Sequence, residues 1–343
     1  MRTVKTGPNM NDARLGEVLS SAPPLLTDAE AMGLVRAHFG VDGALKRLTS
    51  ERDLNIRITT PGQTYVLKLA NPAEPAEVTD FQTKALLHLE GSNLPVPKVI
   101  RTTTGATEVI TPHGTLRLLT YLEGTPQHLT PRTPAQARAM AAMAARLTQG
   151  LAGFAHPAAG YVLQWDIKQA SALRPMLAAV PEDMQALART ALDRFDALAP
   201  ELAGLRWQVV HNDLNPHNVL VSPDNPDEIA GVLDFGDMVH TPLICDAAIA
   251  ASYCVDPARP LDSLLNFARA YHAVLPLTAD EARLFPDLVA TRMLTTLTIA
   301  SARAQAYPDN APYILRNVAT AREGLAALAG TPRGDMINTL ETL

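Results

Sequence analysis

The sequence predicts an α+β fold in two parts, a small antiparallel sheet with one helix followed by a larger, mainly helical part. Alternating apolar and polar residues, which are typical of strands, are concentrated between residues 26 and 120. Long segments rich in Ala, Leu and Arg, which favour helices, dominate residues 121–343. With 343 residues, of which 47% are hydrophobic, the chain can bury enough apolar surface for two packed units.

The chain begins with a segment that carries few signs of regular structure. Residues 1–25 are polar and contain the helix breakers "PNMND" and "APP", so we expect a loosely held tail. Thr27 followed by Glu30 is the pattern of a capping box and predicts the start of a helix. Gly40 suits the end of that helix, because glycine readily adopts the left-handed conformation of a helix terminus.

Two strands joined by a tight turn are predicted next. The segments "LNIRITT" and "TYVLKLA" flank "PGQ", and both alternate between apolar and polar residues. The alternation places Tyr65, Leu67 and Leu69 on one face of the second strand and Val66 and Lys68 on the other. Lys68 is therefore a cation in the interior of a strand.

A helix and two more strands complete the first part. Apolar residues recur at helical spacing from residue 77 to residue 90, and "LPVPKVI" and "TLRLLTY" are strand-like segments around a turn at "HG". After "LEGTPQ", short strands are expected only around 208–234. The predicted helices of the second part are 133–152, 169–180, 182–198, 261–274, 279–305 and 310–329.

Composition excludes several classes of function. The formal net charge of -6 and the isoelectric point near 5.8 give no basic surface for nucleic acid or for acidic membranes. Cys245 and Cys254 form no metal-ligand pattern and suit a reducing compartment. The N-terminus lacks an apolar leader, and no apolar run approaches the roughly 20 residues of a membrane span. We expect a cytoplasmic protein without nucleic-acid or membrane partners.

The segments "HNDLNPHNVL" and "GVLDFGD" carry the strongest chemical signal. Phosphoryl transfer from a nucleoside triphosphate requires magnesium against the phosphates, an oriented hydroxyl and a cation on the phosphates that stay behind. Asn218 and Asp234 offer the oxygen ligands that Mg²⁺ prefers, and Asp213 can accept the proton of the attacking hydroxyl. Lys68 offers the cation.

Other polar residues near these motifs have structural alternatives. His211 is expected to brace the loop by hydrogen bonds rather than to act as a base. Asp246 lies among apolar residues, where a carboxylate caps or ties neighbouring backbone. His217, Asn212 and Asn215 either face a substrate or satisfy the backbone of the turn.

The two segments, the strand lysine in "YVLKLA" and "LPVPKV" together resemble the aminoglycoside phosphotransferase family, which includes choline and homoserine kinases. The resemblance covers roughly residues 27 to 330 and is greatest to the hydroxylysine kinase branch, through "LDFGDMVHTP" and "RLLTYLEGTP". It implies a two-lobed protein-kinase-like fold, with an N-lobe at 26–120 and a C-lobe at 121–343.

The resemblance also implies roles for particular residues. Asp213 would be the catalytic acid/base, Asn218 and Asp234 the Mg²⁺ ligands, and Lys68 the residue on the α- and β-phosphates. The segment Leu119 to Leu122 would be the linker between the lobes. The nucleotide base would contact this linker at Thr120, Tyr121 and Leu122.

The sequence departs from the family pattern at two places. The family's lysine is usually oriented by a glutamate of the inserted helix, and Gln82 occupies that position here. No GxGxxG phosphate loop is present, so contacts to the phosphates are expected from backbone N–H groups or from the side chains of Ser50, Arg52 and Asn55.

Arg292 raises the question of the substrate. It is the single charge on an apolar stretch of a predicted helix, and a buried guanidinium needs an anion. We expect an internal carboxylate such as Asp246, with the carboxylate of a hydroxylysine-like substrate as the alternative. In that alternative Asp237 and Asp166 would bind the substrate's amines.

The sequence thus predicts a magnesium-dependent kinase that transfers the γ-phosphate of ATP or GTP to a hydroxyl of a small hydroxy amino acid or amino alcohol. Homoserine, choline or aminoglycoside kinases are alternatives within the same family. A nucleotide-binding pseudokinase or interaction protein is a second alternative, left open by Gln82. A protein kinase is disfavoured because no APE-like segment follows "DFG".

Overall fold

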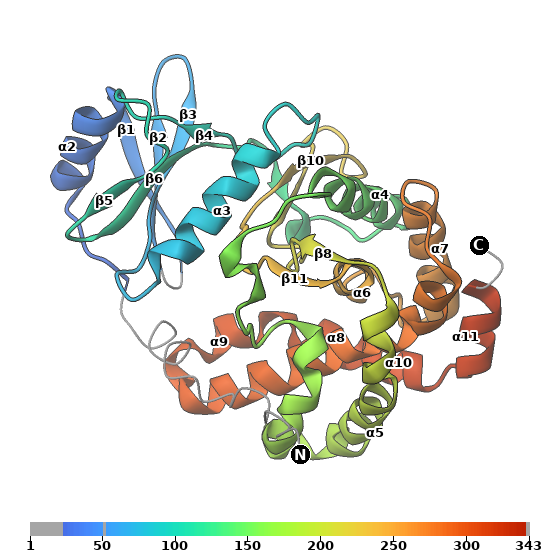
Figure 1. Ribbon diagram of the computed structural model, residues 1–343. Coiled ribbons are helices and arrows are strands. Elements are labelled where there is room, and N and C mark those ends of the chain that lie inside the picture. The colour runs from blue at the N-terminus through green and yellow to red at the C-terminus, as the bar shows by residue number, and fades with distance from the viewer. Residues whose placement is uncertain (1–22, 51–52, 341–343) are drawn as a thin grey trace, which may run out of the picture. The chain divides into compact units, whose positions relative to one another are not determined.

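The structure, a computed structural model, describes residues 23–50 and 53–340 (Figure 1). The tail predicted at 1–25 therefore lies almost wholly outside the described residues. The chain divides into two compact units. The first runs to Glu123 and includes His156–Ala158, and the second comprises Gly124–Ala155 and the chain from Ala159 onward. The α+β class and the small antiparallel sheet before a larger helical unit are confirmed.

The first unit is built on one antiparallel sheet with the order β1-β2-β3-β6-β4, and β5 pairs with β6. Its strands are β1 (Ala44–Leu48), β2 (Leu54–Thr59), β3 (Thr64–Leu69), β4 (Val99–Ile100), β5 (Val109–Thr111) and β6 (Gly114–Thr120). The turn between β2 and β3 is closed by Thr60, whose N–H donates to the Gln63 carbonyl at 3.0 Å.

Two helices pack on the sheet of the first unit. Helix α2 (Asp28–Phe39) begins with the predicted capping box of Thr27 and Glu30 and ends at Gly40, whose φ is 64°. Its apolar face forms a core with alternate, inward-facing residues of β2, β3 and β6. Helix α3 (Ala76–His88) contacts the opposite face, where its Gln82 and Thr83 side chains bond to Arg117 of β6 (Figure 1).

The second unit is mainly helical. Its α-helices are α4 (Pro134–Gly150), α5 (Glu182–Leu198), α6 (Leu243–Ser252), α7 (Pro260–His272), α8 (Ala279–Ala306), α9 (Ala311–Ile314), α10 (Val318–Ala329) and α11 (Arg333–Leu340). Its short 3₁₀ segments are η1 (Gln127–Leu129), η3 (Ile167–Ala179), η4 (Ala199–Gly204), η5 (Pro308–Asn310) and η6 (Leu315–Asn317), and η2 (Pro157–Gly160) begins in the first unit. Two predicted helices differ from the structure.

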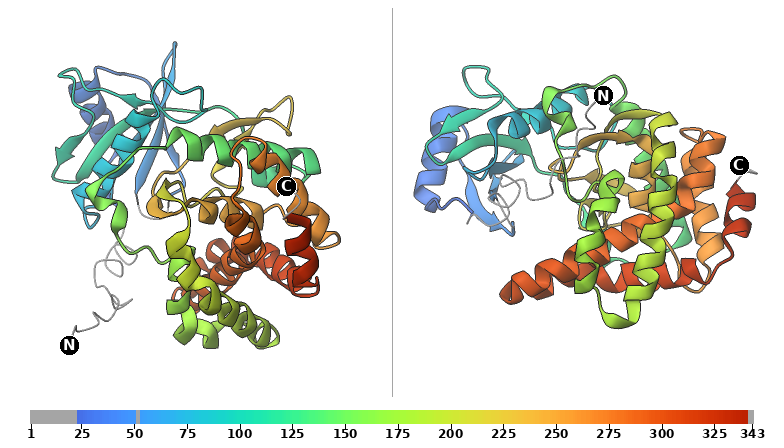
Figure 2. Two further views of the ribbon diagram at one scale, coloured as in Figure 1. Left: turned by 45° about the vertical axis from the view of Figure 1, so that its right-hand side comes forward. Right: turned by 60° about the horizontal axis from the view of Figure 1, so that its bottom comes forward.

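The predicted helix at 169–180 is a 3₁₀ segment, because Pro175 lies inside it and has no N–H to donate. The predicted helix at 310–329 is divided into α9 and α10 by the single 3₁₀ turn of η6. Helix α8 is long and almost entirely buried over its central turns, and it packs against η3, α5, α6 and α10. Figure 2 shows α8 as one continuous helix of this unit.

Short strands of the second unit position the two motif segments. They are β7 (Thr125–Pro126), β8 (Trp207–Val210), β9 (Val219–Val221), β10 (Ile229–Val232) and β11 (Val239–Pro242). β9 lies between β7 and β10, and β8 pairs with β11, all antiparallel. In the part of the chain that the structure describes, no helix combines the length and the apolar character needed to cross a bilayer.

Candidate active site

The segment "HNDLNPHN" is the loop between β8 and β9, and "DFGD" follows β10. The β9–β10 hairpin pairs Val219 with Val232, so the residues just outside this pair lie at the same end of the ladder. The Leu233 N–H donates to the Asn218 carbonyl at 2.7 Å and extends the pairing by one step. Asn218 and Asp234 are thereby brought close together by backbone hydrogen bonds.

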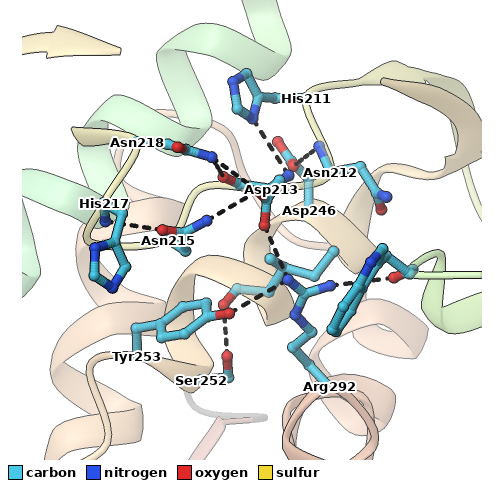
Figure 3. Close-up of polar contacts among 12 residues, drawn as sticks. His211, Asn212, Asp213, Asn215, His217, Asn218, Asp246, Ser252, Tyr253 and Arg292 are labelled. Atoms are coloured by element: carbon cyan, nitrogen blue, oxygen red, sulfur yellow. Dashed lines mark hydrogen bonds and ion pairs between the residues drawn. The ribbon is translucent and has the colours of Figure 1, made fainter. Parts of the chain in front are cut away.

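Asp213 is held by three side-chain donors (Figure 3). Its Oδ1 accepts from Arg292 Nη2 at 3.0 Å, and its Oδ2 accepts from Asn215 Nδ2 at 2.9 Å and from Asn218 Nδ2 at 2.8 Å. About a fifth of the side chain, 19%, stays exposed. Burial raises the pKa of Asp213, whereas the charge of Arg292 and the hydrogen bond from Asn215 oppose that rise. The arrangement fixes the direction of one accessible carboxylate.

Both motif segments contain a backbone conformation that side chains rarely adopt. Among the described residues other than glycine, only Asn212 (φ 65°) and Asp234 (φ 58°) have positive φ. Such conformations cost free energy, although Asn and Asp tolerate them best. The Asn212 N–H donates to Asp246 Oδ1 at 2.7 Å, and the Gly236 N–H donates to Asp234 Oδ1 at 3.1 Å. Strain at these two positions is a sign of a functional site.

His211 and Asp246 are buried beneath the loop and connect it to its surroundings. His211 Nε2 lies 3.0 Å from the Leu233 carbonyl, and its Nδ1 accepts from the Asp213 N–H at 3.3 Å. Burial lowers the pKa of His211 and raises that of Asp246 to about 6, with the charge of His211 acting against the second shift. These are the contacts of residues that support the loop.

Arg292 lies on α8, is 3% exposed, and has an internal anion as its partner. The partner is Asp213, which differs from the expectation of Asp246. The guanidinium also donates to the Trp165 carbonyl at 3.1 Å and to the Tyr253 hydroxyl at 3.3 Å, and it lies 5.5 Å from the centre of the Trp165 ring. Arg292 is therefore held by internal partners through Nη1 and Nη2, whereas its buried Nε has no partner among the described residues.

In the first unit, Lys68 stands in a row of polar residues on one face of the sheet. β2, β3 and β6 place Asn55, Lys68 and Arg117 directly opposite one another. Gln82, which the sequence places as the partner of Lys68, instead accepts from Arg117 Nη2 at 3.0 Å. The reason is the position of Arg117, whose buried guanidinium donates hydrogen bonds to Thr79, Gln82 and Thr83 of α3.

The structure also locates the other predicted nucleotide contacts. Asn55 Oδ1 is buried and accepts no hydrogen bond from residues 23–50 or 53–340. Ser50 Oγ accepts from the Asp53 N–H at 3.3 Å, and Arg52 lies outside the described residues. The N–H groups of Thr120 and Tyr121 donate to the carbonyls of Lys98 and Thr64, at 2.9 and 3.0 Å. These two N–H groups are thus used within the first unit.

The predicted substrate residues have different surroundings. Asp166 is buried, caps η3, and is bonded to Lys168 and Thr241, so it is not brought into the group around Asp213. The charge of Asp237 acts on Arg292. The ring of His217 stacks at 4.0 Å from that of His128, and burial lowers the pKa of His217 to about 4.

Asn215, for which the sequence left a substrate contact and a turn contact open, donates to Asp213 and accepts from the His217 N–H at 2.8 Å. Two further residues of the site were missed by the sequence analysis. Tyr253 and Trp165 contact Arg292 from other elements, and no local pattern marks them.

The residues present fit a divalent cation that is shared with phosphates. Among the described residues no group of three or more His, Cys, Asp or Glu side chains is arranged to hold a metal. Mg²⁺, however, commonly takes one or two protein oxygens and completes its shell with phosphates and water. Because the amide nitrogen of Asn218 is turned to Asp213, its oxygen is free for such a role beside Asp234.

A strand lysine on a small antiparallel sheet and this Asp–Asn–Asp arrangement in a helical unit are typical of kinases with the protein-kinase-like fold. The chain belongs to the phosphotransferase enzyme family, which residues 44–285 match.

Comparisons with individual proteins agree with this assignment. The chain is 27% identical to mouse (Mus musculus) hydroxylysine kinase over 341 residues, covering 90% of this chain and 91% of the relative. It is 28% identical to a homoserine kinase from Methylobacillus flagellatus, covering 68% and 72% of the two chains. An amicoumacin kinase solved with AMP-PNP, Ca²⁺ and Ami has a similar fold, with a TM-score of 0.64, 17% identity and coverage of 90% and 95%.

Proposed function

We propose that this protein transfers the γ-phosphate of ATP or GTP, in a magnesium-dependent reaction, to a hydroxyl of a hydroxy amino acid or amino alcohol resembling hydroxylysine. The observation that carries the proposal is the carboxylate of Asp213, which three side-chain donors hold beside Asn218 while part of it stays accessible. A carboxylate in this state can orient an acceptor hydroxyl and take its proton.

The other residues divide the remaining tasks. Asn218 and Asp234 are the proposed Mg²⁺ ligands, and the bound ion would neutralise negative charge on the phosphates. Lys68 supplies a cation for the α- and β-phosphates. Asn55, which lies opposite Lys68 with a buried and unpaired oxygen among the described residues, is a polar contact for the same ligand. Ser50 remains a candidate for the phosphates.

The base of the nucleotide is proposed to contact the segment from Thr120 to Leu122. The N–H groups of Thr120 and Tyr121 are already bonded within the first unit, so Leu122 is the position whose backbone N–H we assign to the base. This assignment uses backbone atoms, which is why the side chains of the segment do not decide between ATP and GTP.

The acceptor class is proposed from the relatives. Hydroxylysine kinase and homoserine kinase, by name, act on amino acids that carry a hydroxyl group. The similarity to hydroxylysine kinase extends over 90% of this chain, compared with 68% for the homoserine kinase, and favours the hydroxylysine-like acceptor.

A panel assay tests the proposed reaction. The protein is incubated with Mg²⁺, ATP or GTP, and hydroxylysine, homoserine, choline, aminopropanol or an aminoglycoside, and phosphorylated acceptor is detected by mass spectrometry. We expect the highest kcat/KM with a hydroxylysine-like acceptor and none without a divalent cation. A protein that binds nucleotide but phosphorylates no acceptor would support the pseudokinase alternative and would contradict the proposal.

A further inference from the structure

A large cavity lies within the second unit, next to the β8–β9 loop (residues 211–218) that carries Asp213, called the catalytic loop below. Its volume is about 800 Å³, which suits a small organic molecule. The walls come from four segments, residues 127–137, 216–217, 253–266 and 316–320. The cavity therefore joins the loop that carries Asp213 to the start of α4, the region before and within α7, and the start of α10.

Two contacts connect this cavity to Asp213. His217 and Pro216 belong to the catalytic loop and line the cavity directly. Tyr253 also lines it, and the Tyr253 hydroxyl accepts from the Arg292 nitrogen that donates to Asp213 Oδ1 (Figure 3). Asp213 itself does not line the cavity, and it is connected to the wall through Tyr253 and Arg292 and through the loop residues Pro216 and His217.

The charges along the wall are not balanced. Three arginines and two aspartates line the cavity: Arg132, Arg259, Arg316, Asp256 and Asp262. Arg259 is paired with Asp256 at 3.4 Å. Neither Arg132 nor Arg316 has a carboxylate partner among the residues that the structure describes. Two guanidinium groups are left to attract an anion.

Local contacts hold both of these arginines at the wall. Arg132 Nη2 donates to the hydroxyl of Thr320, another lining residue, at 2.8 Å. The guanidinium of Arg316 stacks 3.8 Å from the centre of the Tyr313 ring and donates to the Tyr313 carbonyl at 3.0 Å. Its charge also reaches the catalytic loop, where it acts on Asp213 and on His217. Arg316 is therefore a preorganised cation of the cavity wall whose charge acts on the catalytic loop.

We propose that this cavity is the acceptor site and that Arg316, assisted by Arg132, binds a carboxylate of the acceptor. The acceptor is then a hydroxy acid rather than an amino alcohol or an aminoglycoside. This inference rests on the proposed function and narrows its substrate class. A guanidinium binds a carboxylate through paired hydrogen bonds, which gives direction as well as affinity.

Asp262, the second aspartate of the cavity wall, fits the ammonium group of an amino-acid substrate. Asp262 in the first turn of α7 lines the cavity, and among the described residues no cation is paired with it. It is the counterpart of a substrate ammonium group. Arg292 does not line the cavity, and its two Nη atoms donate to Asp213, the Trp165 carbonyl and Tyr253, so Arg316 is the residue that we assign to this role.

The test compares two acceptors that differ only in a carboxylate, hydroxylysine and the amino alcohol formed by its decarboxylation. In Arg316→Met the KM for hydroxylysine should rise at least tenfold, while kcat/KM for the decarboxylated compound stays within twofold. Arg316→Lys should lie between the wild type and Arg316→Met. Arg322→Met on α10 is the matched control, since Arg322 is paired with Asp183 and does not line the cavity.

Calorimetric titration of hydroxylysine into the nucleotide-free protein gives a second readout that needs no turnover. Tenfold weaker binding to Arg316→Met, with an unchanged melting temperature, supports the inference. Equal effects of Arg316→Met on both compounds, or a wild type that prefers the decarboxylated compound, would overturn it while the kinase assignment stands. Failure of the proposed function itself would be seen separately, as absence of phosphorylation of every acceptor by the wild type.

Discussion

At the scale of single residues, the site is organised around one carboxylate. Sequence spacing singled out Asp213, Asn218 and Asp234, whose roles stay predictions. The structure places Asp213 in the loop after β8, Asn218 just before β9 and Asp234 just after β10. The sequence also predicted that His211 and Asp246 support the loop structurally, and their hydrogen bonds to Leu233 and Asn212 agree with that role. The partner of Asp213 on α8 could not be predicted, since Arg292 is 79 residues away in the sequence.

The pair of Arg292 and Asp213 gives the first prediction. Arg292→Met should lower kcat at least tenfold, because Asp213 loses the donor that fixes Oδ1, and should leave the KM for nucleotide nearly unchanged. Removal of one partner of a buried ion pair also costs about 3–5 kcal/mol in the free energy of unfolding. Steady-state kinetics and urea denaturation measure the two effects.

The matched control is the same change in an Asp213→Asn background. There the loss of unfolding free energy caused by Arg292→Met should be smaller, because the negative charge is already absent. Equal losses in the two backgrounds would show that Arg292 acts through packing and not through Asp213.

Gln82 and Lys68 give a second prediction at this scale. Gln82→Ala should destabilise the first unit by about 1–3 kcal/mol, because the buried Arg117 loses one of its acceptors on α3, with little effect on kcat. Lys68→Ala should leave the unfolding free energy within about 0.5 kcal/mol and lower kcat/KM for the nucleotide. Loss of kcat in Gln82→Ala as large as in Lys68→Ala would mean that Gln82 acts on the lysine after all.

At the scale of elements, alternation and capping signals predicted the sheet of the first unit well. The sequence did not predict that Arg117 would face α3, because a register between strands follows from turns and packing that no single segment contains. Pro175 explains why the segment η3 is a 3₁₀ helix and not the predicted α-helix. The predicted helix at 310–329 is interrupted by η6, which is the single turn Leu315–Asn317.

The short β9–β10 hairpin is the element that places the proposed metal ligands. Gly124 packs closely against β9 of this hairpin, so a substitution of Gly124 tests the role of the hairpin. Gly124 has φ 155°, and a Cβ there would lie 2.8 Å from Leu220 Cβ and 3.0 Å from the Val221 carbonyl oxygen. Gly124→Ala should cost about 2 kcal/mol or more of unfolding free energy and weaken the response of activity to Mg²⁺. Denaturation and a Mg²⁺ titration measure both.

Gly204→Ala is the control for that change, because its added Cβ meets no heavy atom within 4 Å. Its unfolding free energy should stay within about 0.5 kcal/mol of the wild type. A Gly124→Ala protein with wild-type stability and an unchanged Mg²⁺ response would show that the hairpin does not depend on this close approach.

At the scale of the whole molecule, the match over residues 44–285 and the likeness to hydroxylysine kinase assign both units to one kinase family. The sequence predicted this class, because its motifs are local and occur in order. It did not predict the cavity that we propose as the acceptor site, whose walls come from four separate segments that only folding brings together. The proposed chemistry nevertheless depends first on one residue of the catalytic loop.

The most direct test of the account is the rate of phosphoryl transfer by Asp213→Asn, measured beside nucleotide affinity and the melting temperature. The substitution keeps the shape of the side chain and removes its negative charge. We predict that kcat falls by a factor of about 100 or more, because the group that orients the hydroxyl and accepts its proton is gone. Nucleotide affinity should stay within threefold. Turnover within threefold of the wild type, in a folded protein, would contradict the central role of Asp213.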